Sequence, residues 1–440
     1  MRISSLLPTA IAFASTSAST EPDAAAHLGH AIKLMSANPL IDTHIDLPQI
    51  IRSLHRNPHS ALPSLNASFS GHIDLPRARE GHLGGAFWTV WAPCPDVLGD
   101  DPGPDFLNPT NHLRDALEML DLIQGMITVH SDDLQFARSS SQVMDAFKAG
   151  KVASLIGLEG THVLGNSLSS MRLLAQLGVR YVTLTHTCHS AFASSCGQVS
   201  GEVFNEVHEG NGLSALGREL VKELNRLGVM VDLSHTSVET MNQVIDLSEA
   251  PVVWTHSGSR ALWDHPRNVP DDVLAKIGDG PGQIDGVVQS VFFPPFIGPY
   301  DEKNERWLAN VSRVADHIEH IASVIGRNRV GIASDFDGMY LEVEGLEDAT
   351  KYPNLVAELI TRGWSDDEVI GVMGGNLMRI MDKVDAVAEA KKSELPSPAV
   401  WEKRGDLPAT RWGGGGHNTY WPADVKKAVE DMGSWRHDEL

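Results

Sequence analysis

Between residues 40 and 338 the sequence repeats one pattern, a short apolar run rich in β-forming residues followed by a longer segment with helical periodicity. Alternating strands and helices form parallel strands with crossover helices, and eight such strands close into a barrel. The pattern therefore predicts an α/β protein with a (β/α)8 barrel. The eight predicted strands are residues 40–46, 85–91, 152–159, 181–186, 229–235, 251–256, 286–293 and 330–335.

Six of these eight runs end in His, Asp or Glu. Barrel enzymes place their chemistry at the C-terminal ends of the strands, so metal-binding residue types are expected there. A doubly wound open sheet also alternates strands with helices, but it gives no reason for such residues at so many strand ends. The barrel is the favoured fold.

Amphipathic helices are predicted in the gaps over residues 112–129, 212–227 and 311–325. Two more, over residues 352–362 and 366–387, are expected to cover the barrel from outside. The remainder of the chain is rich in Pro, Gly and Trp, which predicts an extended arm. The predicted organisation is one barrel domain over residues 28–390 and an arm over residues 391–440.

The chain carries 35 basic and 57 acidic residues, a net charge of −22, without a compact run of Lys and Arg. Because a surface of this sign repels phosphate backbones, nucleic acid is not expected as a partner. Residues 1–18 contain one Arg, an apolar stretch and no acidic residue, which predicts a signal peptide, with a disordered tail as the alternative. No later segment has about 18 uninterrupted apolar residues, so neither a spanning helix nor a membrane anchor is expected.

The last four residues read HDEL, a retention signal of the endoplasmic reticulum. With the signal peptide it predicts a location in the lumen of that compartment, and secretion is the alternative. Asn66 and Asn310 each begin an Asn-X-Ser glycosylation triplet. Three cysteines, Cys94, Cys188 and Cys196, lack the CxxC spacing of zinc and redox motifs, so at most one intrachain disulfide can form.

His44 and Asp46 lie two residues apart in the first run. Strand side chains alternate between faces, so both are expected to point towards the barrel mouth, where they offer a cation one imidazole and one carboxylate. Glu159 ends the third run between two glycines. A buried carboxylate is costly unless it is paired, so we expect Glu159 to bridge two cations, with a structural salt bridge to an arginine as the alternative.

His235 and His256 end consecutive runs, and two imidazoles at equivalent positions suit a second metal ion. Asp335 ends the eighth run and could accept a proton from a metal-bound water and pass it to a leaving amine. Asp337, which precedes a glycine, is more simply a turn residue.

His186 ends the fourth run, where it could donate a hydrogen bond to the oxyanion of a tetrahedral intermediate. Arg267 follows the sixth run, and its planar fork suits a substrate carboxylate. The alternative for Arg267 is an ion pair on the surface.

Together these segments resemble the membrane (renal) dipeptidase family of zinc peptidases over about residues 28–390. The resemblance implies a soluble, fungal-type member without a lipid anchor. It rests on five segments: residues 39–48 (PLIDTHIDLP), 151–160 (KVASLIGLEG), 184–188 (LTHTC), 267–272 (RNVPDD) and 335–338 (DFDG).

The resemblance implies two Zn²⁺ ions per subunit, one bound by the pair of the first strand, the other by the two later histidines, with the glutamate between them. In chain order the ligands would be His44, Asp46, Glu159, His235 and His256. The residues that orient the substrate or transfer protons would be His186, Arg267 and Asp335.

The family also has an intrachain disulfide at the positions of Cys94 and Cys188, which would leave Cys196 free. Trp263 stands at a further cysteine position of the family, so a second disulfide is not expected. The cysteine that links two subunits of the mammalian enzymes is absent as well. Any homodimer is therefore expected to be non-covalent.

Two expected substrate-side residues depart from the family pattern. Gln49 replaces an aromatic residue, and Phe296 stands where the family has a tyrosine. The specificity is therefore expected to differ from that of the relatives.

The expected function is hydrolysis of L-dipeptides that have a free C-terminal carboxylate, including Cys-Gly and its S-conjugates, by a hydroxide held between two zinc ions. Two alternatives stay open. One is a metal-dependent amidohydrolase acting on a non-peptide amide, lactam or ester. The other is a non-catalytic binding protein of the endoplasmic reticulum.

Overall fold

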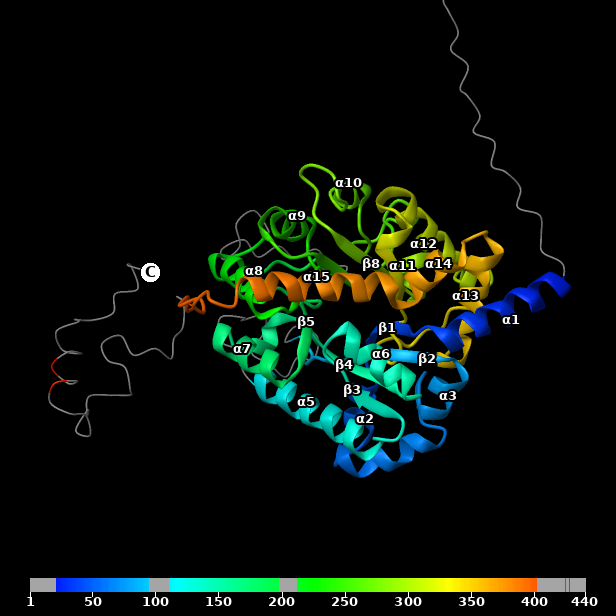
Figure 1. The fold of residues 1–440 in the computed structure, drawn as a ribbon, viewed down its shortest axis with the longest axis horizontal. Helices are drawn as coiled ribbons and strands as arrows, with labels where there is room; N and C mark the ends of the chain where they lie inside the picture. Colours follow the sequence, from blue (N-terminus) through cyan, green and yellow to red (C-terminus); the bar gives the residue numbers. More distant parts are fainter. Residues whose placement is uncertain (1–20, 95–110, 198–211, 402–423, 425–426, 428–440) are drawn as a thin grey trace, which may run out of the picture.

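The computed structural model describes residues 21–94, 111–197, 212–401, 424 and 427. Eight parallel strands form the barrel, with helices between them (Figure 1), so the predicted (β/α)8 fold is confirmed. In spatial order the strands are β1 (Leu40–Ile45), β2 (Leu83–Val90), β4 (Val152–Glu159), β5 (Val179–Thr183), β6 (Met230–Asp232), β7 (Val252–Ser257), β8 (Gly286–Val291) and β11 (Val330–Ala333). The short strand β3 (Leu134–Phe136) pairs with the start of β4, and β9 (Tyr300–Asp301) pairs with β10 (Arg306–Trp307) in a separate hairpin.

The barrel closes where β11 meets β1, at the C-terminal ends of both strands. The amide of Asp46 donates to the carbonyl of Phe336 at 2.8 Å, and the amide of Asp335 donates to the carbonyl of His44 at 3.2 Å. These bonds involve residues at or just beyond the strand ends, so the seam is held next to the barrel mouth.

A buried carboxylate, Asp42, adds to this seam. It accepts from the backbone amide of His44 on its own strand at 3.0 Å. Across the seam, it accepts from the backbone amide of Ser334, just after β11, at 3.0 Å. The hydroxyl of Tyr352 donates to it at 2.6 Å. Because Asp42 is fully buried, these donors replace the water that the carboxylate would otherwise need.

The helices cover the outside of the barrel, and Figure 1 shows α15 crossing the body of the molecule and α1 lying beside α13. The predicted helices over residues 112–129 and 311–325 are α5 and α12. The full set in the described part is α1 (Glu21–Ala37), α2 (Leu47–Leu54), α3 (Leu75–Glu80), α5 (His112–Val129), α6 (Ser140–Lys148), α7 (Leu168–Leu177), α8 (Ala215–Leu227), α9 (Val238–Leu247), α10 (Asp271–Leu274), α11 (Pro294–Ile297), α12 (Val311–Ile325), α13 (Tyr352–Thr361), α14 (Asp366–Ile370) and α15 (Asn376–Ala390).

The prediction of one continuous helix over residues 366–387 was wrong. The glycine-rich segment Gly371–Gly375 interrupts it between α14 and α15, and Gly374 has a non-helical backbone. A Cβ atom on Gly374 would lie 2.9 Å from the side chain of Ile41 and from the carbonyl of Pro39. The chain therefore departs from helical geometry where it passes close to the start of β1.

Several strands end earlier than the sequence pattern predicts. Four of the candidate site residues expected at strand ends lie beyond the strands, and two of them have left-handed backbones, His235 with φ of 63° and Asp335 with φ of 61°. Such conformations are uncommon outside glycine. They turn the chain sharply at the barrel mouth. The four residues are Asp46, His186, His235 and Asp335.

The predicted signal peptide and the HDEL tetrapeptide lie outside the described residues, so both stay predictions. Of the predicted arm, residues 391–401, 424 and 427 are described; residues 391–401 have no regular secondary structure, and Trp401 is buried. Asn66 and Asn310 are exposed, and their glycosylation stays a prediction. None of the described helices combines the length and apolar character that crossing a membrane requires.

Gly157 on β4 gives room to the ring of Tyr181 on β5, because a Cβ at position 157 would lie 2.1 Å from the ring carbon Cζ. We predict that Gly157→Ala lowers the free energy of unfolding by about 1–3 kcal/mol through overpacking, as measured by urea denaturation. The matched control is Gly29→Ala in helix α1, where a Cβ meets nothing within 4 Å. That substitution should stabilise the protein by up to about 1 kcal/mol. An unchanged stability of Gly157→Ala would contradict the packing described here.

Candidate metal centre

The C-terminal ends of the strands bring imidazole groups around the Glu159 carboxylate. Its Oε1 atom lies 3.1 Å from Nε2 of His235 and 3.3 Å from Nε2 of His256. Nε2 of His186 is 3.9 Å from the same oxygen. These close partners are imidazoles, so the alternative of a structural salt bridge between Glu159 and an arginine is not what the described structure shows.

The second oxygen of Glu159 faces the pair of the first strand. Nε2 of His44 lies 3.5 Å from Glu159 Oε2 and 3.5 Å from Asp46 Oδ2. Asp335 Oδ1 is 4.0 Å from the same nitrogen. The two oxygens of one carboxylate thus face two separate groups of nitrogen and oxygen atoms, as a bridging ligand of two cations would.

The donor atoms of this cluster fit divalent cations. Nε2 of His44 and Oδ1 of Asp46 are buried, and neither has a hydrogen-bond partner in the described structure. Such atoms are costly to leave unsatisfied. The carboxyl groups of Asp46, Glu159 and Asp335 are also buried, and each lies within 4.0 Å of the same atom, Nε2 of His44. Without a compensating positive charge, their burial would be strongly unfavourable.

The hydrogen bonds of Thr255 assign the tautomer of His256. The Thr255 hydroxyl donates to Asp232 Oδ2 at 2.7 Å, so its oxygen can only accept from Nδ1 of His256, 3.0 Å away. Burial lowers the pKa of His256 well below its ordinary value, and the charges of His44 and Arg267 act in the same direction. The neutral ring then carries its lone pair on Nε2, the atom that faces Glu159.

Tyr181 supports His44 in a way that sequence reasoning missed. Its buried hydroxyl lies 3.1 Å from Nδ1 of His44, on the side of the ring away from the cluster. A partner at one ring nitrogen of a histidine fixes the orientation of the other nitrogen. Gly157 permits this contact, because it leaves room for the tyrosine ring.

Two supporting carboxylates, Asp42 and Asp232, were also missed. Asp42 was open to prediction, because it continues the two-residue alternation of His44 and Asp46 on the first strand. Asp232 accepts from the hydroxyls of Thr183 and Thr255 and thereby links three neighbouring strands. These two hydroxyls come from separate segments, and no local pattern in the sequence indicates them.

The carboxyl groups of the cluster differ in protonation. Burial raises the pKa of Glu159, but the charges of His186 and His44 outweigh this effect and hold the pKa well below its usual range. Burial raises the pKa of Asp335 to about 8, with the charges of Asp46 and Glu159 adding to the rise and that of His44 opposing it. Glu159 is therefore suited to remain an anion, and Asp335 to exchange a proton near neutral pH.

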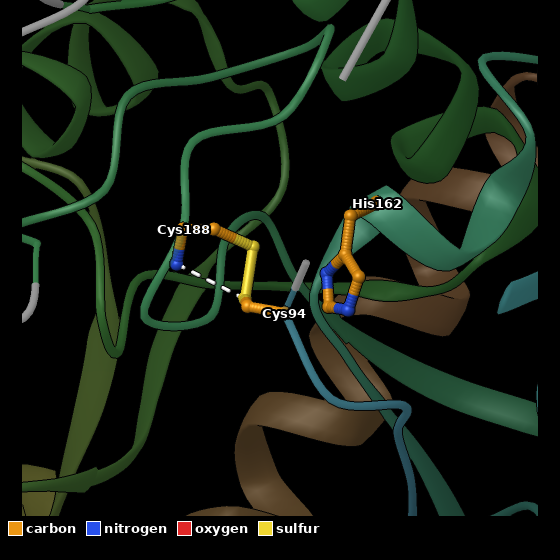
Figure 2. A group of neighbouring side chains, drawn as sticks. All are labelled: Cys94, His162 and Cys188. Carbon is orange, nitrogen blue, oxygen red and sulfur yellow. Dashed lines mark hydrogen bonds between the residues drawn. A yellow bond between two sulfur atoms is a disulfide. The ribbon is translucent and has the colours of Figure 1, made fainter. Parts of the chain in front are cut away.

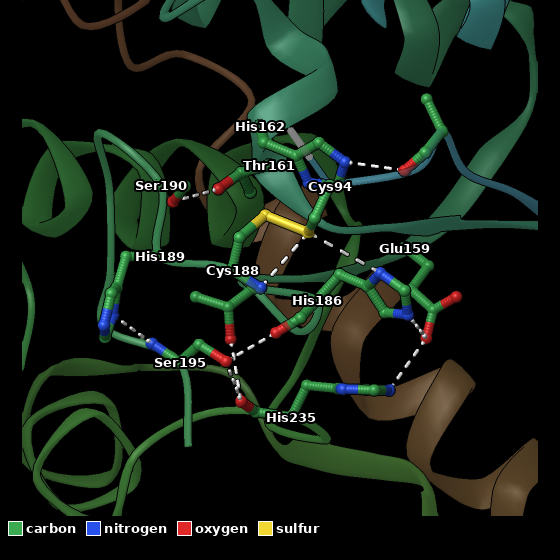
Figure 3. Close-up of a disulfide and its surroundings, with 12 residues drawn as sticks. Cys94, Glu159, Thr161, His162, His186, Cys188, His189, Ser190, Ser195 and His235 are labelled. Atoms are coloured by element: carbon green, nitrogen blue, oxygen red, sulfur yellow. Dashed lines mark hydrogen bonds and ion pairs between the residues drawn. A yellow bond between two sulfur atoms is a disulfide. The ribbon is translucent and has the colours of Figure 1, made fainter. Parts of the chain in front are cut away.

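The expected disulfide between Cys94 and Cys188 is present in the structure, and Cys196 is free. Figure 2 shows His162 beside the two sulfur atoms, which are joined to each other and are therefore not thiolate ligands. Figure 3 shows His186 between the disulfide and Glu159, with its Nδ1 at 3.8 Å from the sulfur of Cys94. The crosslink thus lies directly against the imidazole that faces the cluster.

Arg267 is buried, with 4% of its surface exposed, so the expected alternative of a surface ion pair is wrong. One terminal nitrogen donates to the carbonyl of His256 at 3.1 Å, and the guanidinium carbon lies 5.0 Å from the ring centre of Phe296. Its Nε atom has no partner in the described structure. Arg267 therefore keeps an unsatisfied donor, as a group that receives a carboxylate would.

The two remaining residues singled out from the sequence lie next to the cluster ligands along the chain. Gln49 lies on α2, and its backbone N–H donates to the carbonyl of Asp46 at 2.9 Å. Asp337 has a left-handed backbone with φ of 68°, which fits the expected turn. Its buried carboxylate also accepts from the amide of His72 at 2.5 Å, so it fastens the neighbouring loop.

We predict that Tyr181→Phe lowers the affinity for Zn²⁺ about 10- to 100-fold, because the His44 ring loses the partner that orients it. Competition between the metal-free protein and a chromogenic chelator measures this affinity. Tyr300→Phe is the control, since it removes an exposed hydroxyl from the β9–β10 hairpin. Wild-type affinity in the Tyr181→Phe variant would show that this hydrogen bond does not support the metal centre.

Comparisons with known proteins show the family of the chain. A family model for membrane dipeptidases (peptidase family M19) matches residues 28–395. Dipeptidase verJ of Clonostachys rogersoniana is 41% identical over 369 residues, which cover 83% of this chain and 89% of that protein.

Two solved structures share the fold over most of their length. The probable dipeptidase PvdM of Pseudomonas aeruginosa superposes with a TM-score of 0.71 at 25% identity, covering 83% of this chain and 100% of that one. A metallopeptidase of Rhodobacter sphaeroides, liganded with a phosphinate mimic of the dipeptide L-Ala-D-Ala, superposes with a TM-score of 0.66 at 26% identity, covering 79% of this chain and 99% of that one. The expected resemblance is confirmed, and the chain belongs to the membrane dipeptidase family M19 as a metallopeptidase of the dipeptidase type.

Proposed function

We propose that this dipeptidase uses two Zn²⁺ ions to hydrolyse L-dipeptides with a free C-terminal carboxylate, including Cys-Gly and its S-conjugates. The observation that carries the proposal is the position of Glu159, whose two oxygens face separate sets of candidate ligands. One ion would be held on the side of the first strand and the other on the side of the two later histidines, with Glu159 shared. The proposed ligands are His44, Asp46, Glu159, His235 and His256.

When bound, the metal ions would polarise the peptide carbonyl and acidify the attacking water. The protein supplies the remaining groups. Asp335, whose Oδ1 lies 4.0 Å from Nε2 of His44, would take up the proton and deliver it to the leaving amine. His186 would donate to the carbonyl oxygen as negative charge develops on it. Arg267 would pair with the substrate carboxylate, to which its unpartnered Nε could donate.

Two features support a peptide over a non-peptide amide or lactam. A buried arginine with an unsatisfied nitrogen is costly unless an anion completes its hydrogen bonds, and a dipeptide brings a carboxylate. The Rhodobacter sphaeroides relative, 26% identical, binds a mimic of a dipeptide. The alternative of a non-catalytic binding protein gives no account of a complete set of donor atoms around Glu159.

The test is the variant Glu159→Ala. We predict that it loses bound zinc and that its kcat/KM falls at least about 10³-fold, because several kcal/mol of transition-state stabilisation depend on the metal ions. Metal analysis should find two zinc ions per subunit in the wild-type protein. The same preparation should hydrolyse L-Ala-Gly and Cys-Gly, with L-Ala-D-Ala and an N-acetyl amino acid as comparison substrates.

The control is Glu239→Ala, which removes an exposed carboxylate in the first turn of α9. It should keep both metal content and activity. Full turnover in Glu159→Ala would refute the proposed bridging role. Wild-type protein that carries zinc but cleaves only the N-acetyl amino acid would favour the amidohydrolase alternative.

The role of Arg267 is tested by Arg267→Lys, which keeps the charge and removes the planar fork. We predict that kcat/KM for L-Ala-Gly falls about 10- to 100-fold, the value of one or two charge-assisted hydrogen bonds. The C-terminal amide of the same dipeptide has no carboxylate, so its slower hydrolysis should change little. An equal loss on both substrates would mean that Arg267 supports the fold of the site instead of the substrate.

A further inference from the structure

A row of aromatic rings lies at the barrel mouth outside the candidate metal centre. It consists of Phe293, Phe296 and Tyr340, and we call it the aromatic strip. The rings of Phe293 and Phe296 are 4.7 Å apart between centres and nearly perpendicular, and those of Phe293 and Tyr340 are 6.2 Å apart. The first two residues follow β8 and the third follows β11, two neighbouring strands.

One end of the strip contacts Arg267. The ring of Phe296 lies against the guanidinium, with 5.0 Å between Cζ and the ring centre. The unpartnered Nε atom belongs to the same side chain. A carboxylate that pairs with this guanidinium would therefore bring the atoms bonded to it close to Phe296.

The other end of the strip lies close to the cluster along the chain. Gly338 stands two residues before Tyr340, and a Cβ atom on it would lie 2.2 Å from Asp46 Oδ2 and 2.6 Å from Asp335 Oδ1. The backbone that leads to Tyr340 thus passes directly over these two carboxylates. The strip therefore extends along the rim from the Asp335 side of the site to the Arg267 side.

The backbone that carries Phe296 is held in place. The amide group of Asn268 donates to the carbonyl of Phe296 at 2.6 Å, and the indole nitrogen of Trp263 donates to the carbonyl of Pro295 at 2.9 Å. Both donors come from the loop that also carries Arg267. The distance between the guanidinium and the strip is therefore fixed by structure outside the strip itself.

Tyr340 is exposed over 83% of its surface. The protein gains little from a ring in that position, because most of its apolar surface remains in water. A ring so placed does offer a surface that a ligand can cover, and covering an aromatic ring in this way is favourable. Phe293 and Phe296 are only partly buried and continue the same surface.

We propose that the aromatic strip binds the side chain of the C-terminal residue of the dipeptide and favours aromatic and large apolar side chains there. The inference rests on the proposed function, because the carboxylate of that residue would pair with Arg267. When it does, the side chain on the neighbouring carbon lies beside Phe296 and extends along the strip. Tyr340 is then a specificity-determining residue.

The test compares L-Ala-L-Phe with L-Ala-L-Ala. The wild-type protein should show the higher kcat/KM on L-Ala-L-Phe, and Tyr340→Ala should lower the ratio of the two values about 5-fold, the value of one aromatic pair. Tyr340→Phe keeps the ring and should keep the ratio. The matched control is Leu173→Ala, which truncates an exposed apolar side chain on α7.

Binding of non-hydrolysable phosphinate mimics of the same two dipeptides, measured by calorimetry, separates this proposal from the proposed function. If neither dipeptide is cleaved but the mimic with the phenyl group binds more tightly and loses that advantage in Tyr340→Ala, the strip stands and the dipeptidase proposal fails. If both dipeptides are cleaved at a ratio that Tyr340→Ala leaves unchanged, the strip is overturned and the dipeptidase proposal stands. Equal binding of the two mimics to the wild-type protein also overturns the strip.

Discussion

The interaction on which the rest of the structure depends is the burial of carboxylates at one end of the barrel. Asp42 and Asp232 are fully buried, and amides and hydroxyls of the protein satisfy them. Asp46 and Glu159 instead face imidazole nitrogens, and Oδ1 of Asp46 has no hydrogen-bond partner in the described structure. A buried carboxylate whose oxygens accept hydrogen bonds from the protein stabilises the barrel. A buried carboxylate with an oxygen that lacks such a bond is available to a cation. The barrel mouth contains both kinds.

The sequence predicted the parts of this arrangement that local pattern determines. Alternation along the first strand placed His44 and Asp46 together, and the repeated strand ends indicated Glu159, His235 and His256. The parts that depend on distant partners were not predictable. Tyr181 reads as one more apolar strand residue until the barrel brings its hydroxyl to His44. Gly374 reads as a helix position until the chain passes β1.

The loops at the barrel mouth meet two different structural requirements. They must hold polar side chains in fixed positions, which explains the left-handed backbones of His235 and Asp335 and the disulfide against His186. They must also leave a surface for the substrate, and Phe293, Phe296 and Tyr340 supply it. His186, His235 and Asp335 lie in the turns directly after their strands, whereas Phe296 and Tyr340 stand further along the loops. Substitutions at Phe296 or Tyr340 would then leave the candidate metal ligands in place.

The seam between β1 and β11 has a consequence for the order in which the protein matures. Asp42 and Ser334, whose contact adds to the closure of the barrel, are separated by 292 positions in the chain. His44 is synthesised early, but the strand that completes its surroundings emerges from the ribosome only after three quarters of the chain has been made. A nascent chain therefore carries donor atoms long before it has a cavity to hold them. Metal binding at the complete site is then a late event. A bound ion would stabilise the closed barrel, because it binds only when β1 and β11 are together.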